Sequence, residues 1–241
     1  MSNSYFRFKH FNINQSDCAM KVGTDGVLLG AWANLPEKGK VLDIGTGTGL
    51  IALMIAQRSE LLQIDAVEID EKAVKQASQN VMCTPWYKRI KVICNDFFEL
   101  NSDYKYDLII CNPPFYQNSP KSSSKNRDKA RSQVCFSIQN FISKASDMLN
   151  DYGKLTFILP ITYEDLIYKY LDDNKLFKCR ICKVQPTPLK PVNRLLIEAS
   201  IGGKEVVLES IIIEENGRHK YSEKYKQLLS DFFISFPKNI H

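Results

Sequence analysis

The sequence predicts an α/β fold in which a largely parallel sheet carries helices on both faces. Three observations predict it. From Lys40 onward, short apolar runs of strand character alternate with longer helical segments, the pattern of a parallel sheet with helical crossovers. A glycine-rich turn joins the first strand to the first helix. The last strand-like runs follow one another without helices, which favours an antiparallel edge.

Each strand is an apolar or alternating run of suitable length. The first, 41–45, ends in glycine, and the last three have no helix between them. The predicted strands are 41–45, 63–68, 90–94, 107–111, 154–159, 178–184, 194–201 and 206–213.

The predicted helices follow from periodicity and from capping residues. Residues 49–58 and 71–82 form the first two. Ser137 can cap a third, and Thr162 with Asp165 resembles a capping box that opens a fourth. The third helix has the apolar face Ile138, Phe141, Ile142, Ala145, Met148 and Leu149.

Three regions lie outside the alternation. Residues 1–39 are aromatic and polar, with a helical-looking segment after Thr24, so we divide the chain into an N-terminal extension, 1–39, and a main domain, 40–241. Residues 116–133 are too rich in Ser and Lys, and too long, for an ordinary connection. A C-terminal amphipathic helix from Tyr221 is expected to pack on the core through Tyr225, Leu228, Leu229 and Phe232.

Composition excludes several classes of protein. With 44% hydrophobic and 24% charged residues, the chain is neither disordered nor collagen-like. It has no secretory signal and no apolar run long enough to span a membrane. The seven cysteines are odd in number and mostly flanked by apolar residues, which indicates reduced thiols in a cytoplasmic protein. Cys179 and Cys182 would face opposite sides of a strand, so we expect no metal site.

The glycine-rich turn predicts a ligand site. Glycine permits positive φ and a close approach of backbone to ligand. The pattern is GxGxG, because Leu50 stands where a dinucleotide fingerprint has its third glycine. Asp43 precedes the loop, so we expect a zwitterionic ligand whose ammonium group contacts an acid and loop carbonyls. The cofactor-binding candidates here are Asp43, Gly45, Thr46 and Gly47.

Two further acids follow later strands. Glu68 ends the second strand, where an acid accepts hydrogen bonds from ribose hydroxyls. Asp96, with Phe97 beside it, follows the third strand and could contact an adenine ring and its amino group. Ile69 adjoins Glu68 and completes this set of cofactor-binding candidates.

The tetrapeptide Asn112-Pro113-Pro114-Phe115 follows the fourth strand. Successive prolines hold this loop in one shape. The Asn112 amide oxygen and the Pro113 carbonyl can accept hydrogen bonds from an amino group and orient its lone pair, which is catalysis by positioning. Phe115 could stack on a base. These four residues are the catalytic candidates.

The segments VLDIGTGTG, AVEID, NDFF and NPPF together resemble class I S-adenosylmethionine-dependent methyltransferases, over roughly residues 20 to 215. The resemblance implies a Rossmann-like seven-stranded sheet with an antiparallel last hairpin, and S-adenosyl-L-methionine as cofactor. NPPF is similar to the [DNS]PP[YFW] signature of amino-group methyltransferases. This resemblance implies that Asn112 also lies in the cofactor pocket, so Asn112 is a cofactor-binding candidate as well.

The N-terminal extension resembles the start of bacterial tRNA1(Val) (adenine(37)-N6)-methyltransferases, on Phe6 to Phe11 and on Asp17 to Trp32. This resemblance implies methyl transfer to the N6 of adenine 37, and an extension that caps the cofactor pocket. Lys21, Thr24 and Asp25 become cofactor-pocket candidates by position, and Thr24-Asp25 would also serve as a helix N-cap.

Three alternatives stay open: an rRNA guanine-N2 methyltransferase, a protein glutamine N5-methyltransferase, and an RNA-binding protein that keeps the fold without activity. The oligomeric state stays undetermined.

The net charge of +5 is concentrated in one segment. From Gln117 to Ser132 there are five basic residues and one acid. Since this segment follows the tetrapeptide, we expect it to contact tRNA phosphates. The RNA-binding candidates are Lys121, Lys125, Arg127, Lys129 and Arg131.

Overall fold

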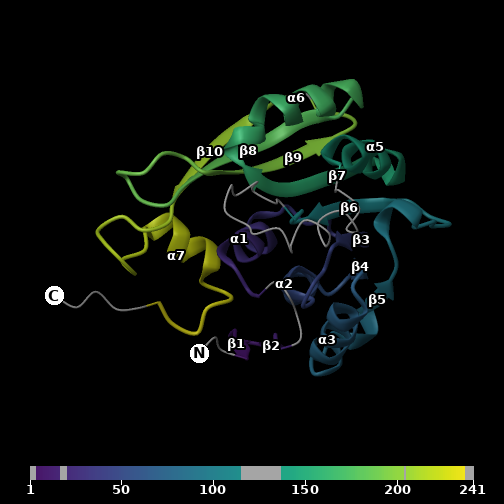
Figure 1. Ribbon diagram of the computed structural model, residues 1–241, viewed down its shortest axis with the longest axis horizontal. Coiled ribbons are helices and arrows are strands. Elements are labelled where there is room, and N and C mark those ends of the chain that lie inside the picture. The colour runs from purple at the N-terminus through teal and green to yellow at the C-terminus, as the bar shows by residue number, and fades with distance from the viewer. Residues whose placement is uncertain (1–3, 17–20, 115–136, 204, 237–241) are drawn as a thin grey trace, which may run out of the picture.

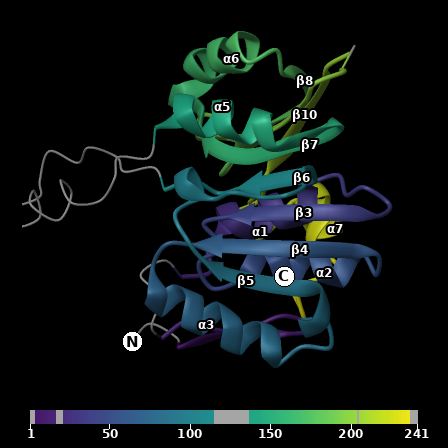
Figure 2. The ribbon, with the colours of Figure 1, turned by 90° about the vertical axis from the view of Figure 1, so that its right-hand side faces the viewer.

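The computed structural model describes residues 4–16, 21–114, 137–203 and 205–236. Its centre is an eight-stranded sheet with the strand order β10-β8-β9-β7-β6-β3-β4-β5. Figure 2 shows the strands of this sheet lying one above another. The strands are β3 (Gly39–Ile44), β4 (Leu62–Glu68), β5 (Ile90–Cys94), β6 (Tyr106–Cys111), β7 (Leu149–Pro160), β8 (Phe177–Gln185), β9 (Arg194–Ser200) and β10 (Val207–Ile212).

All eight predicted strands are present, one more than the resemblance implied. The antiparallel edge expected from the closing strands is wrong for the outermost strand, β10, which runs parallel to its neighbour β8. β3 pairs in parallel with both β4 and β6, while β9 lies antiparallel between β7 and β8. These seven strands form the arrangement that the resemblance implied. The eighth, β10, pairs in parallel with β8 at the sheet edge, where its buried Ile211 joins the core.

Helices cover both faces of the sheet. Neighbouring β9 residues show this, because Leu196 belongs to one apolar cluster and Ile197 to the other, as the alternation of side chains along a strand requires. Helices α1, α2 and α7 contribute to the first cluster, and α5 and α6 to the second. The helices are α1 (Thr24–Trp32), α2 (Leu50–Arg58), α3 (Glu71–Met82), α5 (Ile138–Met148), α6 (Glu164–Asp173) and α7 (Glu223–Leu229).

The predicted helix caps are right in one case and wrong in two. Ser137 caps α5 as predicted, accepting a hydrogen bond from the Asn140 N–H. The predicted Thr162–Asp165 capping box is wrong, because Ile161–Tyr163 form a 3₁₀ turn directly after β7 and α6 begins only at Glu164. The N-cap of α1 is Gly23, and Thr24 is the first helical residue with no side-chain cap.

The N-terminal and C-terminal segments pack together, although they are far apart in the sequence (Figure 1). β1 (Tyr5–Arg7) and β2 (Asn12–Asn14) form an antiparallel hairpin. The Lys9 N–H donates a 2.8 Å hydrogen bond to the carbonyl of Phe232. The predicted C-terminal helix is confirmed as α7, and Tyr225, Leu229 and Phe232 are buried with Leu228 half-buried.

The five cysteines among the described residues are free thiols. Within the same part of the chain, no helix has the length and hydropathy to cross a membrane.

Candidate functional site

The glycine loop connects β3 to α2 and uses positive φ at Gly45, Gly47 and Gly49, with φ of 66°, 56° and 83°. At Gly49 a Cβ would lie in ordinary contact with Ala77, 3.6 Å from its Cβ, so the positive φ is what favours glycine at this position. At Gly45 a Cβ would meet nothing within 4 Å. The first half of the loop therefore has open space beside its backbone, as a ligand site at this loop would require.

Asp43 holds the loop against α2. It is fully buried, and its Oδ2 accepts hydrogen bonds from Thr46 Oγ1 at 2.6 Å and from the Ala52 N–H at 3.1 Å. Burial raises the pKa of Asp43 to about 7, the two hydrogen bonds oppose that rise, and the nearby charge of Glu68 adds to it. Oδ1 has no partner among the described residues, which leaves one oxygen for an ammonium group.

Glu68 anchors the opposite side of the loop. Its carboxylate accepts hydrogen bonds from the N–H groups of Gly47 at 2.9 Å, Ile69 at 2.9 Å and Asp70 at 3.0 Å. The side chain is half-buried at the end of β4, and its residue pairs in register with Cys94 at the end of β5. Glu68 therefore lies beside the loop, at the same edge as Asp96.

The adenine candidates differ in how accessible they are. Ile69 is 61% exposed and provides an apolar surface next to Glu68. Asp96 is half-buried and caps a short 3₁₀ turn by accepting from the Phe98 N–H. The ring of Phe97 is only 6% exposed and packs 6.1 Å from the ring of Phe141. The Phe97 ring is therefore part of the core, and Ile69 provides the apolar surface that a ligand can reach.

The first residues of the tetrapeptide lie beside the glycine loop. Cys111 of β6 pairs in register with Ile44 of β3, so Asn112 and Gly45 occupy equivalent positions one residue beyond the paired strands. β3 is also the strand at which the sheet order reverses, the place where open α/β sheets bind ligands. Asn112 and Pro114 are half-buried and Pro113 is buried.

Helix α1 reaches this same edge. A Cβ at Gly26 would lie 3.2 Å from Leu50 Cδ2 and 3.8 Å from Asn112 Nδ2. The absence of a side chain at Gly26 therefore lets α1 pack closely on Leu50 of α2, and Asn112 lies next to this position. Lys21 and Thr24 are exposed just before this contact.

Asp25 contacts a residue that the sequence did not single out. Its Oδ2 accepts a 2.8 Å hydrogen bond from Arg194 Nε. Arg194 begins β9 opposite Pro160, the last residue of β7, so the antiparallel pairing brings it to the edge that carries Asn112. No local motif marks Arg194, and only the strand register could have found it.

Some predicted site residues lie outside the described residues. They are Phe115, Lys121, Lys125, Arg127, Lys129 and Arg131.

The residues at this edge fit S-adenosylmethionine by their chemistry. The glycine loop is open, Asp43 has an unpartnered buried oxygen, and Ile69 is an exposed apolar neighbour of Glu68. Acids for an ammonium group and for ribose hydroxyls thus lie next to a surface for adenine. Over the described ranges, no three His, Cys, Asp or Glu residues come together to hold a metal ion.

Known proteins are similar to this chain over most of its length. Residues 21–178 match the methyltransferase small domain. A tRNA1(Val) (adenine(37)-N6)-methyltransferase of Christiangramia forsetii is 42% identical, covering 97% of this chain and 99% of the relative. A protein of the same name from Histophilus somni is 40% identical, covering 96% and 98%.

Solved structures share the fold at lower identity. A protein of Agrobacterium tumefaciens described as a predicted O-methyltransferase matches with a TM-score of 0.67 at 19% identity, covering 86% of this chain and 96% of that one. The ribosomal protein L11 methylase of Lactobacillus delbrueckii matches with a TM-score of 0.55 at 15% identity, covering 78% and 83%.

Proposed function

Because the chain belongs to the methyltransferase small-domain family and, within it, to the tRNA1(Val) (adenine(37)-N6)-methyltransferases, we propose that it methylates the exocyclic N6 of adenine 37 in tRNA1(Val). The observation that carries this proposal is the register of β3 and β6. It puts Asn112 directly beside the open glycine loop, so an amino group held at Asn112 lies next to a ligand held by the loop.

When bound, S-adenosylmethionine supplies the electrophilic methyl group. Glu68 would accept hydrogen bonds from the ribose hydroxyls, and Oδ1 of Asp43 would face the ammonium group. Ile69 and Asp96 would contact the adenine, with the buried Phe97 supporting Asp96 from the core. The loop residues Gly45, Thr46 and Gly47 would line the ligand, since the loop leaves open space at Gly45.

Asn112 and Pro113 would act on the substrate amino group. An Asn112 side-chain oxygen and the Pro113 carbonyl would each accept one N–H, which orients the nitrogen lone pair. A strong base is unnecessary, because the proton becomes acidic once the nitrogen carries the methyl group. Pro114 fixes the shape of the loop, and Phe115 would stack on the base.

The N-terminal extension, 1–39, would cap the cofactor pocket, with Lys21 and Thr24 at its edge. The position of Gly26 against Asn112 supports this role. Lys121, Lys125, Arg127, Lys129 and Arg131 would contact phosphates, and such an enzyme would act in the cytoplasm on tRNA.

Nucleoside analysis tests this function. Unmodified tRNA from cells that lack the modification would be incubated with the protein and with isotope-labelled S-adenosylmethionine. We expect labelled N6-methyladenosine in tRNA1(Val), and none with Asn112→Ala. A parallel incubation contains unmodified ribosomal RNA, where labelled N2-methylguanosine would instead identify the guanine-N2 alternative. No label in either RNA would refute RNA methylation.

A further inference from the structure

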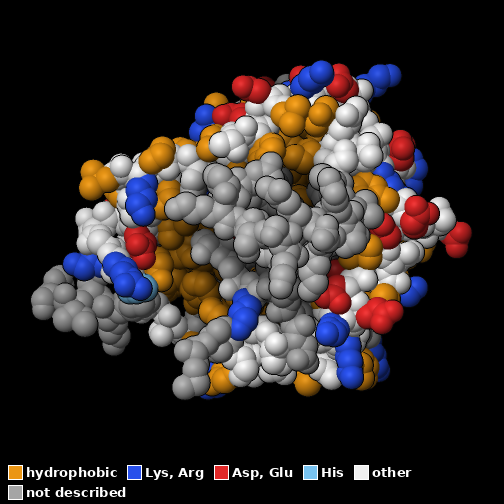
Figure 3. Space-filling model, in the orientation of Figure 1, with side chains coloured by type: hydrophobic (Ala, Val, Ile, Leu, Met, Phe, Trp, Pro, Cys, Tyr) orange, Lys and Arg blue, Asp and Glu red, His pale blue; other side chains and the backbone are white. Residues whose placement is uncertain are grey.

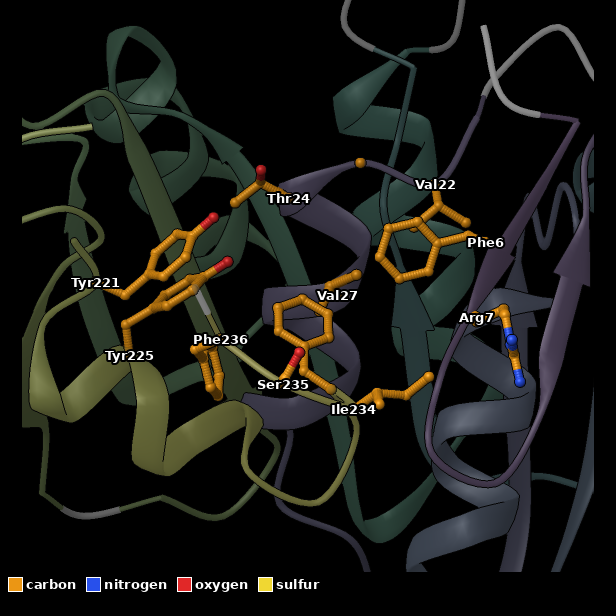
Figure 4. A pocket seen from close by; sticks show the side chains of 12 residues that line it. Phe6, Arg7, Val22, Thr24, Val27, Tyr221, Tyr225, Ile234, Ser235 and Phe236 are labelled. Carbon is orange, nitrogen blue, oxygen red and sulfur yellow. The ribbon is translucent and has the colours of Figure 1, made fainter. Parts of the chain in front are cut away.

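A second cavity lies next to the proposed active site, between the start of α1, the hairpin strand β1 and the C-terminal segment. Its volume is about 390 Å³, within the range of pockets that hold a small ligand. The glycine loop, Glu68 and Asp96 are not among its lining residues, and Thr24 is the one cofactor-pocket candidate among the described residues that lines it. Figure 4 shows its lining side chains.

Five of its twelve lining residues carry aromatic rings, namely Phe6, Tyr221, Tyr225, Phe233 and Phe236. Tyr221 and Tyr225 are stacked, with ring centroids 5.2 Å apart and an interplanar angle of 19°. Tyr225 is only 4% exposed, whereas Tyr221 is half-buried. The cavity thus has a flat aromatic surface that the core supports from behind.

Polar groups lie at one end of the cavity. The hydroxyls of Tyr221 and Tyr225 point towards Thr24 (Figure 4), and Ser235 and Arg7 also line the cavity. A flat apolar surface with hydroxyls at its edge suits a nucleobase, which stacks through its faces and forms hydrogen bonds through its edges. A purely aliphatic ligand would leave these hydroxyls unused.

Charged side chains of both signs surround the cavity. Next to Tyr221 along the chain, Arg218, Lys220 and Lys224 are exposed, and so are Glu215 and Glu223. Arg7 is exposed at the other wall. In Figure 3, hydrophobic side chains gather over the α7 region, next to both basic and acidic side chains. The stacked aromatic surface, and not the surrounding charge, is therefore what favours a base as the ligand.

The distance to the target is short. Thr24 lines the cavity, and Gly26, two residues further along α1, lies next to Asn112, where an added Cβ would be 3.8 Å from Asn112 Nδ2. Two residues of helix span about 3 Å, comparable to the rise of about 3.4 Å per nucleotide in a stacked strand. A nucleotide near the target adenine can therefore reach the cavity.

We propose that this cavity receives one unpaired base of the RNA substrate, a neighbour of the target adenine. The inference rests on the proposed function, since it takes an RNA loop as the ligand. A second base bound in this way would fix the register of the loop and present one adenine to Asn112. RNA proteins commonly read single-stranded loops by stacking their bases on aromatic side chains.

The test measures binding of a fluorescently labelled anticodon stem-loop RNA by the full chain. Tyr221→Ala should weaken binding by roughly 5- to 100-fold, the range found for loss of a base-stacking ring, and Tyr221→Phe should lose much less. Affinity for S-adenosylmethionine should not change. The matched control is Tyr152→Ala, since Tyr152 is 92% exposed near the start of β7, at the sheet edge opposite Asn112, and it should bind RNA like the wild type.

An abasic scan identifies the base. In the wild type, removing the base that enters the cavity should lower the affinity as much as Tyr221→Ala does. In Tyr221→Ala, removing the same base should not lower the affinity further. If every abasic loss adds to the loss from Tyr221→Ala, or if Tyr221→Ala binds like the wild type, the inference is wrong. Should Tyr221→Ala fail to fold, Ile234→Asp serves instead, because Ile234 is 56% exposed at the cavity and a carboxylate there should repel the RNA.

The outcome is separable from that of the proposed function. A wild type that forms no N6-methyladenosine refutes the proposed function. A wild type that forms it, with Tyr221→Ala equally active at limiting RNA, refutes only the cavity inference.

Discussion

Arg194 Nε donates a 2.8 Å hydrogen bond to Asp25 Oδ2, and this ion pair joins the start of α1 to the sheet edge that carries Asn112. The neighbouring residue of α1, Gly26, lies next to Asn112, since a Cβ added there would be 3.8 Å from Asn112 Nδ2. At the other end of α1, Trp32 Nε1 donates a 2.6 Å hydrogen bond to Glu209 of β10. Polar contacts to two different strands thus fix the helix along its length.

Arg194→Ala should lower turnover more than stability. The side chains of Arg194 and Asp25 are 28% and 35% exposed, and such pairs stabilise a fold by less than about 1 kcal/mol. A small shift of α1 against Asn112 would still reduce turnover, by roughly 3- to 30-fold. Thermal melts and steady-state kinetics measure both quantities.

The control for this prediction is Lys178→Ala, which breaks the ion pair with Asp172 where β8 begins. It should leave turnover unchanged. The double exchange Asp25→Arg with Arg194→Asp should recover part of the lost turnover. Equal losses in Lys178→Ala and Arg194→Ala would show that α1 does not position Asn112.

Asn112→Ala should abolish most of the turnover while cofactor binding persists. Loss of one oriented hydrogen-bonding group in an active site costs about 100- to 1,000-fold in rate. Single-turnover methylation measures the rate, and calorimetry with S-adenosylmethionine measures binding. Asn101→Ala, at an exposed position after β5, is the control. A large loss of cofactor affinity in Asn112→Ala would assign Asn112 to binding instead.

Glu68→Ala should weaken binding of S-adenosylmethionine. It removes an acceptor of ribose hydroxyls and also frees the Gly47 N–H, which Glu68 holds at 2.9 Å. Hydrogen bonds to a charged group are worth about 1.5–3 kcal/mol each, so affinity should fall at least tenfold. Glu68→Gln should lose less, since one amide oxygen can still accept from Gly47. Calorimetry measures the affinity for S-adenosylmethionine, with Glu60→Ala, a change at an exposed position, as the control. Unchanged affinity in Glu68→Ala would contradict the assigned role.

Asp43→Asn should change how stability depends on pH. Burial raises the pKa of Asp43 to about 7, so the folded protein keeps a proton there that the unfolded chain releases near pH 4. This contribution to stability is fully present below about pH 4 and is lost as the pH rises through 7. Relative to the wild type, Asp43→Asn should gain about 2 kcal/mol of unfolding free energy between pH 5 and pH 8.

Urea unfolding at the two pH values measures that difference. A stability difference between Asp43→Asn and the wild type that does not vary with pH would show that Asp43 titrates normally.

Gly30→Ala should destabilise the packing of α1 on α2. A Cβ at Gly30 would lie 2.8 Å from the sulfur of the fully buried Met54. Overpacking of this kind costs about 1–3 kcal/mol, against about 1 kcal/mol gained from helix propensity. Chemical unfolding should show a net loss. Gly202→Ala, where a Cβ would meet nothing within 4 Å, should be neutral, and an equally stable Gly30→Ala would mean that Met54 moves aside.

Local patterns were sufficient for most of the elements and for the order of the site residues. Glycine at positive φ, the alternation along β3 and β4, and the acid at the end of β4 all depend on neighbouring residues, so the sequence alone predicted Gly45, Glu68 and Asn112 as one site. The prediction of a capping box at Thr162 was wrong because Thr162 lies in the 3₁₀ turn that follows β7. A capping pattern in the sequence does not reveal such a turn.

Tertiary structure decided which groups remain available to a ligand. The sequence placed Asp43 and Phe97 in the site, but burial commits one oxygen of Asp43 to the loop and the Phe97 ring to the core. Asp25 and Arg194 are 169 positions apart in the sequence. The aromatic cavity joins residues that are more than 200 positions apart. The sequence by itself therefore determined the fold class and the strand-end residues, since these follow from short-range periodicity. Only long-range packing determined which side chains are exposed and which distant segments meet.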